Sequence, residues 1–360
     1  MNNTIGTNIT LTVFGESHGC SIGACIDGIP AGIKVPFDYI QAKLNLRKAK
    51  GAISTARHEE DQPIFLSGIY NGYTEGNPIS FILKNKQYND AEYQVNIARP
   101  SHADYVAYEK YFHYMNMAGG NFFSGRLTTV MVVAGAFCQK MLEDKKIFIG
   151  SHIEQLKNIK DRSWQNYEQD IKMLSQKEFP VLDEQKEKEM YQQIMLALKN
   201  GDSVGGILET AIIGLPVGLG NPIFASLEAE LARAIFAIPA VKGIAFGKGF
   251  DFTNFYGSEV NDLYYYDQQV KTRTNNNGGI NGGISNGMPL IFHTSFKPTA
   301  SISKKQESIN LETKKQVFLQ LNGRHDPTII HRARVVVDAM TAFVLMNAYI
   351  EREKECIWQK

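Results

Sequence analysis

The apolar positions of the chain predict three long helices. Leu127–Met141 is apolar nearly all round, which is typical of a helix buried on every side. Arg334–Tyr349 places apolar side chains at three- and four-residue spacing. A third, amphipathic helix is predicted over Ser226–Ile238, where Ser226 is a suitable N-cap and Pro239 marks the end.

Shorter apolar runs bounded by Gly, Asn or Pro predict strands at Ile5–Phe14, Ile207–Leu215 and Asn254–Tyr266. Residues 154–189 are charged and poorly patterned, so we expect a connector that carries solvated helices. Residues 304–312 have the composition of a mobile surface loop.

The first and second halves of the chain contain similar glycine patterns in the same order. Gly19–Gly23 precedes Gly28–Gly32, and Gly201–Gly205 precedes Gly214–Gly218. A Gly-Ile-x-Asn-Gly turn then precedes a proline and an apolar run, at 68–72 and again at 283–287. Such ordered self-similarity indicates an internal duplication. We therefore predict one α+β domain over 1–360, with similar βαβ-like halves at about 1–150 and 196–360 around a common helical core, and a connector at 151–195.

The composition limits the classes of partner that this protein could bind. The 360 residues carry 38 Lys and Arg against 37 Asp and Glu, so a net charge of +1 favours neither nucleic acid nor an anionic membrane. Apolar runs such as Val130–Phe137 are short for a membrane span, and residues 1–4 do not resemble a signal peptide. Four cysteines without a CxxC pair favour a reducing, cytoplasmic compartment. Any anion site must be a local cluster, and we expect no metal site.

The first polar cluster follows a predicted strand, at Phe14–Gly19. Its glycines allow a sharp turn that presents Ser17 and His18, and a histidine there could act as a general acid. The alternative is a turn whose Ser and His satisfy local backbone groups, and for this cluster alone that alternative is preferred.

Two more clusters precede predicted helices. In Arg99–Asp104, Ser101 could cap a helix that begins near His102, and such a terminus would favour an anion and lower the pKa of the histidine. In Gly119–Arg126, free amides could hold an anionic or flavin group. The alternatives are an ordinary helix cap and a core segment with a salt-bridged arginine.

The second half contributes three further clusters. Gly278–Gly283 could let a flat ring or a phosphate approach the backbone, although a hairpin turn explains it equally well. Lys297–Ser301 adds a cation and two hydroxyls. Gly323–Pro327 places an arginine, a histidine and a carboxylate side by side, shortly before an apolar helix.

Taken together and in order, these motifs resemble the chorismate synthase family over nearly the whole chain. The resemblance rests on the clusters at 15–19, 99–104, 282–285, 297–299 and 323–327. It implies a βαβ-sandwich with a helical core, assembled as a homotetramer. It also implies anti-1,4-elimination of phosphate from 5-enolpyruvylshikimate 3-phosphate to give chorismate, with reduced FMN and no net redox change.

The resemblance also implies residue roles. His18 and His102 match the family's catalytic acids, with Ser17 beside them, and Asp326 matches the carboxylate that assists proton removal. The implied flavin contacts are Phe123, Ser124, Ala240, Gly282, Lys297, Pro298, Thr299, Ala300, Ser301 and Arg324. The implied substrate-binding residues are Arg47, Arg57, Arg99 and Arg126. A substrate with two carboxylates and a phosphate needs several fixed cations, and arginine binds both groups bidentately.

The chain departs from the family pattern at a few positions. Ser101, Asn121 and Pro239 replace common Gly, Gly and Asn, and Phe122 stands where the family has Arg or His. Residues 46–51 lack a second arginine that the family places near the substrate or nicotinamide. We therefore expect NADPH to be used only if the protein reduces its own flavin. Otherwise we expect a separate flavin reductase to reduce the flavin.

Two other functions remain open. Phe122 and Asn121 favour a diverged, non-catalytic flavin-binding relative, whereas the retained His18, His102 and Asp326 argue against it. A flavin oxidoreductase on the same scaffold is the second alternative, but no Rossmann glycine fingerprint follows a strand.

Overall fold

The first part of the chain forms an antiparallel sheet with the order β1-β2-β3-β7-β4. The computed structural model describes residues 3–49, 51, 53–54, 59–86, 96–116, 118–321 and 325–357. The elements of this part are β1 (Thr4–Ile5), β2 (Thr10–Gly15), β3 (Ser21–Asp27), α1 (Phe37–Arg47), β4 (Ile64–Phe65), β5 (Ile69–Tyr70), β6 (Tyr73–Thr74), β7 (Ile79–Lys84), α2 (Asp104–Lys110), two short 3-10 segments (Ala118–Phe123 and Gly125–Leu127) and α3 (Thr128–Asp144).

The second part forms another antiparallel sheet, with the order β11-β16-β10-β8-β9. Its elements are β8 (Phe148–Leu156), β9 (Ile159–Lys160), α4 (Tyr167–Gln176), α5 (Glu184–Lys199), β10 (Gly206–Ile213), α6 (Leu227–Phe236), β11 (Val241–Phe246), α7 (Gly257–Val260), β12 (Tyr264–Asp267), β13 (Gln269–Thr272), β14 (Ile280–Asn281), β15 (Ile284–Ser285), β16 (Leu290–Phe296), β17 (Gln306–Ile309), β18 (Gln316–Leu319), α8 (Ile330–Cys356) and two 3-10 segments (Ile223–Ala225 and Gly249–Asn254).

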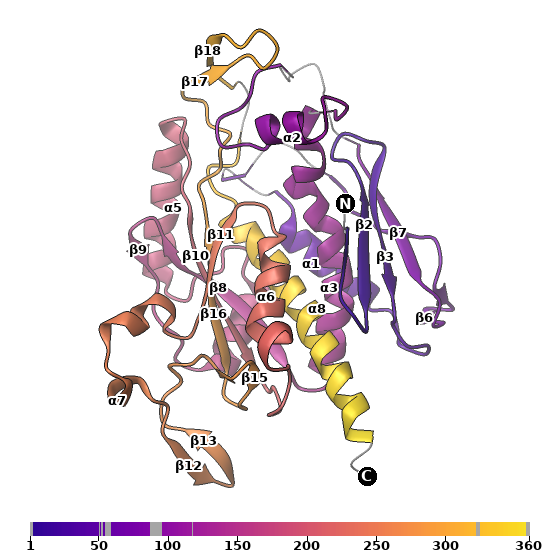
Figure 1. The fold of residues 1–360 in the computed structure, drawn as a ribbon, viewed down its shortest axis with the longest axis vertical. Coiled ribbons are helices and arrows are strands. Elements are labelled where there is room, and N and C mark those ends of the chain that lie inside the picture. The colour runs from indigo at the N-terminus through magenta and orange to yellow at the C-terminus, as the bar shows by residue number, and fades with distance from the viewer. Residues whose placement is uncertain are drawn as a thin grey trace.

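The two sheets repeat one topology. The spatial order β2-β3-β7-β4 corresponds to β8-β10-β16-β11, and every pair in both sheets is antiparallel. In each part a helix (α1 or α6) follows the second of these strands, a small hairpin (β5–β6 or β14–β15) precedes the strand that is third in this spatial order, and a long helix (α3 or α8) comes last. Figure 1 shows these four helices standing between the two sheets. The predicted α+β fold of two similar halves around a helical core is confirmed.

The centre of the molecule is the contact between α3 and α8. Twelve of the seventeen residues of α3 are buried, as the all-round apolar pattern predicted. A Cβ on Gly135 would lie 2.4 Å from the Ala339 Cβ, so the two helix backbones pack closely at this point. By length and mean hydropathy α8 could cross a membrane, but 83% of its apolar window is buried inside the protein. In this fold α8 is a core helix.

Several local predictions differ from the structure. The boundary expected at residue 150 falls inside β8, so the predicted connector at 151–195 begins within a strand of the second sheet. The strand expected at 254–266 is instead α7 followed by β12, whose exposed hairpin with β13 lies at the edge of the molecule (Figure 1). The loop expected at 304–312 contains β17, which pairs with β18.

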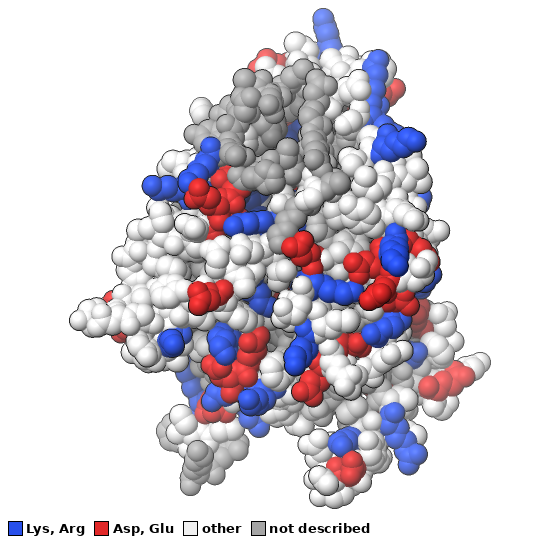
Figure 2. Space-filling view, turned by 180° about the vertical axis from the view of Figure 1, so that it is seen from behind, with Lys and Arg blue, Asp and Glu red and all other residues white. Residues whose placement is uncertain are grey.

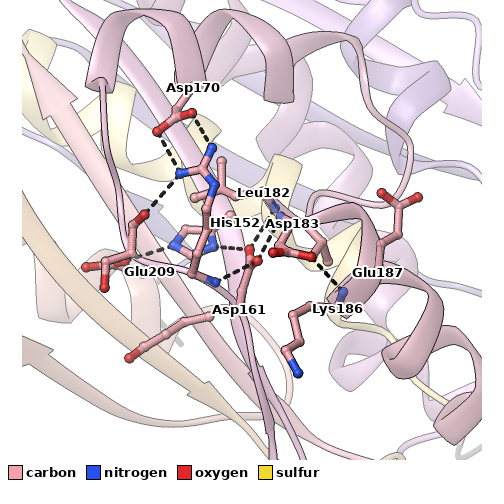
Figure 3. A network of polar contacts seen from close by, with 12 residues as sticks. His152, Asp161, Asp170, Leu182, Asp183, Lys186, Glu187 and Glu209 are labelled. Carbon is pink, nitrogen blue, oxygen red and sulfur yellow. Dashed lines mark hydrogen bonds and ion pairs between the residues drawn. The ribbon is translucent and has the colours of Figure 1, made fainter.

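The face of the molecule that Figure 2 displays carries no large area of one charge sign. Figure 2 shows blue and red side chains interspersed over the face that it displays, in agreement with the net charge of +1. On the second sheet, charged side chains form a network of hydrogen bonds and ion pairs, which Figure 3 shows.

That network centres on His152, whose side chain is completely buried. Its Nδ1 lies 2.8 Å from Asp161 Oδ2 and its Nε2 lies 2.8 Å from Glu209 Oε2 (Figure 3). Burial alone would lower the pKa of His152, but the hydrogen bonds to the two carboxylates raise it. Asp161 also accepts backbone N–H bonds from Leu182 and Asp183, so the network ties the segment before α5 to the sheet.

Candidate active site

A cavity of about 860 Å³ lies at one end of the helical layer. It is lined by the C-terminal ends of α1 and α6 and by the N-terminal ends of α3 and α8, so both halves contribute to it. The helix dipole at the two N-terminal ends favours an anion. The volume is near the upper end of the roughly 300–1,000 Å³ that small-molecule sites occupy.

His18 reaches this cavity from the turn after β2. The Gly19 N–H donates to Glu16 O at 3.1 Å, which closes a four-residue turn with Ser17 and His18 at its centre. The imidazole lies directly against Gly119, because a Cβ there would be 2.0 Å from His18 Nε2. Ser17 does not line the cavity: it is fully buried, and its hydroxyl donates to Gly119 O at 3.1 Å.

His102 enters from the segment before α2. The helix begins later than expected, at Asp104, and Ser101 does not cap it because Ser101 has a left-handed φ of 60°. Arg99 and Asp104 instead form a bidentate ion pair, with both N–O distances at 2.7 Å. His102 Nε2 lies 2.9 Å from Ser301 Oγ, which connects this segment to the second half.

The surroundings of His102 favour the neutral imidazole. Burial is the largest cause and Arg99 the second, with Lys297 and His325 adding to them against the opposing charge of Asp104. Together they lower the pKa of His102 to about 4. The expected lowering is therefore present, although its main cause is burial rather than a helix terminus.

Arg47 and Arg126 form the cationic floor of the cavity. Arg126 pairs with Asp61 through Nη1, and Arg47 lies 3.9 Å from the other oxygen of that carboxylate. Arg47 also donates to Gly125 O and Thr128 Oγ1 at the start of α3. Burial lowers the pKa of Arg47, and the neighbouring charges of Arg332 and Arg126 lower it further. An anion bound here would relieve that repulsion.

The segment 297–301 forms another wall, and all five of its predicted contact residues line the cavity. The Lys297 ammonium donates to Ser101 O at 2.7 Å. Thr299 Oγ1 is buried and has no hydrogen-bond partner among the described residues. Asp326 has an oppositely charged partner in Arg332, which lies on the first turn of α8.

Most of the residues implied by the resemblance meet in this cavity. Those that line it are His18, Arg47, Arg99, His102, Phe123, Ser124, Arg126, Ala240, Lys297, Pro298, Thr299, Ala300, Ser301 and Asp326. Arg57 and Arg324 lie outside the described residues.

Gly282 is the exception in the second half. It occupies the β14–β15 hairpin, and the neighbouring Gly283 O accepts from Leu227 N at the start of α6. The cavity is at the other end of that ten-residue helix, about 15 Å away. The structure thus gives Gly282 a turn role and does not bring it to the cavity.

Sequence reasoning missed several ionic residues of the cavity, among them Asp61 and Arg332. Asp61 is 4% exposed and lies in a charged run, 59–61, that suggests only a solvated turn. Arg332 lies six residues beyond Asp326, and its buried Nε has no hydrogen-bond partner among the described residues. A signal for Arg332 existed, because it starts the apolar helix that directly follows the 323–327 cluster.

Cations outnumber carboxylates around the cavity. Among the described residues, seven Lys or Arg and four Asp or Glu line it. The cations are Arg47, Lys48, Arg99, Arg126, Lys242, Lys297 and Arg332, and the carboxylates are Glu59, Asp61, Asp104 and Asp326. With three histidines also present, the arrangement can bind a polyanion and move protons beside it.

Comparisons with known proteins point to one family. The family model of chorismate synthase matches residues 9–350. The chorismate synthase of Pyrococcus abyssi is 44% identical over 357 residues, which covers 98% of each chain. That of Thermococcus gammatolerans is 41% identical over 97% of this chain and 98% of the relative. That of Phocaeicola vulgatus is 39% identical over 97% and 98%.

A solved crystal structure of a chorismate synthase shares the fold. Its TM-score is 0.72 at 24% identity, over 97% of this chain and 93% of that one. The match of the family model over nearly the whole length, and the level of identity with several relatives, decide the assignment. This chain belongs to the chorismate synthase family, whose members are lyases.

Proposed function

We propose that the cavity is the active site at which phosphate is eliminated from 5-enolpyruvylshikimate 3-phosphate, with reduced FMN as cofactor. The observation that carries this proposal is the excess of cations in a cavity that also contains His18, His102 and Asp326. The substrate carries two carboxylates and a phosphate, so its negative charge matches the excess. The leaving phosphate gains charge as it departs, and fixed guanidinium groups stabilise that change most.

The arginines and helix ends have the binding role. Arg47 and Arg126 are held by Asp61 and by the start of α3, so their guanidinium groups are oriented before the substrate arrives. The start of α8 adds Arg332 and the positive end of its helix dipole. Positively charged groups thus surround one part of the cavity, which suits the phosphate and carboxylates.

The proton-handling groups are His18, His102 and Asp326. The ligand-free surroundings keep His102 neutral at pH 7, and a bound polyanion would offset Arg99 and Lys297 and restore its proton. Asp326 pairs with Arg332 and lies beside the cavity, where it can assist removal of a proton. Residues 297–301 would hold reduced FMN against the cavity wall, and the flavin would supply reversible one-electron chemistry with no net redox change.

The residues present fit a flavin. Thr299 Oγ1 and Arg332 Nε are buried in the wall, and neither has a hydrogen-bond partner among the described residues, so they can serve a polar ligand. Phe122, Ile238, Val241 and Val336 provide apolar surface for a flat ring. Phe122 lines the wall with a ring where the family has a basic residue.

The finer properties of the enzyme are also proposals. Residues 46–51 lack the family's second arginine, which supports flavin reduction by a separate reductase rather than by NADPH bound here. Homotetramer assembly and a cytoplasmic location rest on the family resemblance and on the cysteine pattern.

An anaerobic assay of phosphate release with dithionite-reduced FMN tests the proposal. Wild-type protein should turn over, and His18→Ala should fold and bind FMN but lose roughly two to four orders of magnitude in rate, as expected for a positioned general acid. His113→Ala is the matched control, because His113 is exposed and lies outside the cavity.

A wild-type protein that binds FMN but releases no phosphate would favour the non-catalytic alternative. A normal rate in His18→Ala would remove His18 from the mechanism.

A further inference from the structure

Asn85 lies just beyond β7, beneath the turn that carries His18. The last pair of the β3–β7 ladder is Ser21 with Lys84, and the next backbone bond runs from Asn85 N–H to Cys20 O at 3.1 Å. The sheet therefore fixes the position of the Asn85 backbone directly beside the turn. The residue is 8% exposed and does not itself line the cavity.

The side-chain amide of Asn85 bonds to both ends of that turn. Nδ2 donates to Glu16 O at 2.9 Å and to Gly19 O at 2.8 Å, and these residues flank Ser17 and His18. Both amide hydrogens are used, so the turn is held at its two ends by one group. Because His18 is one of the two central residues of the turn, its position depends on this support.

The oxygen of the same amide contacts the anion-binding floor. Asn85 Oδ1 accepts from Arg126 Nε at 3.0 Å, while the Nη1 of Arg126 pairs with Asp61. The orientation of the amide is decided by these partners, because a flipped group would place its oxygen against two carbonyls and its NH₂ against a guanidinium. One planar group thus joins the His18 turn to Arg126.

We propose that Asn85 is a positioning residue that sets the geometry between His18 and the anion held by Arg126. This inference rests on the proposed function, since it assigns His18 to proton handling and Arg126 to anion binding. Displacement of a catalytic group by about 1 Å can cost roughly a hundredfold in rate. Loss of the amide should therefore affect both catalysis and anion binding, although Asn85 touches neither ligand.

The test uses Asn85→Leu, which has nearly the same shape and no polar atoms. With dithionite-reduced FMN, we expect its kcat to fall about 10- to 100-fold. The dissociation constant of the flavin-free protein for inorganic phosphate, measured by calorimetry, should rise about three- to tenfold, because Arg126 loses one of the three contacts that orient its guanidinium group, those to Asn85, Asp61 and Lys84 O. Asn77→Leu, on the exposed turn before β7, should change neither value.

Double variants separate positioning from a general loss of structure. If Asn85 acts through His18, adding Asn85→Leu to His18→Ala should reduce kcat less than twofold further. If it acts through Arg126, adding it to Arg126→Gln should not weaken phosphate binding further. Independent, multiplicative losses in both pairs would overturn the proposal, as would a kcat for Asn85→Leu above half of the wild-type value.

If the leucine variant does not fold, Asn85→Ser replaces it in the same measurements. It leaves space for water near the turn, and kcat and phosphate affinity should change in the same directions. Failure of the proposed function is distinguishable, because the wild-type protein would then release no phosphate. An active wild type with an unaffected Asn85→Ser variant contradicts only the role of Asn85.

Discussion

Single side chains in the cavity owe their chemistry to neighbours that are distant in the sequence. His102 lies beside Ser301, which is 199 positions away, and Arg126 pairs with Asp61 across 65 positions. The residue types of the cavity could be predicted from clustered motifs. Their pairing could not, because it depends on the turn at Asp61, which has a left-handed φ of 49°, and on the packing of the two halves.

A prediction at this scale concerns the proton on His102. Burial and Arg99 lower its pKa to about 4 in the ligand-free protein, so the imidazole should be neutral from pH 5 upwards. A bound polyanion opposes Arg99 and Lys297, so inorganic phosphate or oxidised FMN should raise the pKa. NMR titration of labelled histidine side chains, with His102→Gln to assign the signal, measures both values.

The sign of the effect on stability follows from the same shift. The folded protein binds fewer protons at His102 than the unfolded chain between pH 4 and about 6.5, so this residue contributes stability above pH 6.5 that is lost as the pH falls towards 4. A midpoint for His102 that is unchanged by saturating phosphate and FMN would contradict the proposed link between its proton and the ligand.

The sequence pattern predicted some helices and strands better than others. The three long helices were confirmed because each buries an apolar face whose period is fixed by the helix itself. The strand expected at 254–266 was wrong, because all five aromatic residues in this segment are exposed and so do not indicate a sheet core. Short hairpins such as β17–β18 depend on turns and partners, which a local pattern does not specify.

The N-cap of α6 gives a prediction for this scale. Ser226 Oγ accepts from Ala229 N at 3.1 Å, as the sequence predicted for this position. Replacing it by alanine leaves that amide without its cap and should lower the free energy of unfolding by about 1 kcal/mol. Urea denaturation measures the change, with Ser258→Ala on exposed α7 as the control. Equal midpoints for the two variants would show that the cap contributes nothing.

At the scale of the whole molecule, the cavity exists only because the two halves share one helical layer. The histidines of the first half reach a cavity that residues 297–301 of the second half also line. The glycine repeats could predict the duplication, since each half uses the same turns before the same strands. The repeats could not predict where the boundary falls, because β8 directly follows α3 with only three residues between them.

The contact between α3 and α8, which joins the two halves, can be tested at Gly135. A Cβ added there would meet the Cβ, carbonyl oxygen and Cα of Ala339 at 2.4–2.5 Å, and backbone cannot move aside cheaply. Gly135→Ala should therefore lower the free energy of unfolding by about 1–3 kcal/mol, although alanine favours a helix. Gly257→Ala, where nothing lies within 4 Å, should stay within about 0.5 kcal/mol of wild type. Similar urea midpoints for the two variants would mean that α3 and α8 can separate freely.

The separation of α3 and α8 along the chain has a consequence for biosynthesis. Helix α3 leaves the ribosome early, but the surface that covers Gly135 and its neighbours is translated almost two hundred residues later. At 5–20 residues per second, the first half of a nascent chain exposes its apolar helix for about ten seconds or longer. We expect chaperones to shield that surface until α8 has been translated, and chains that terminate before α8 should become substrates for proteolysis rather than partly active enzymes.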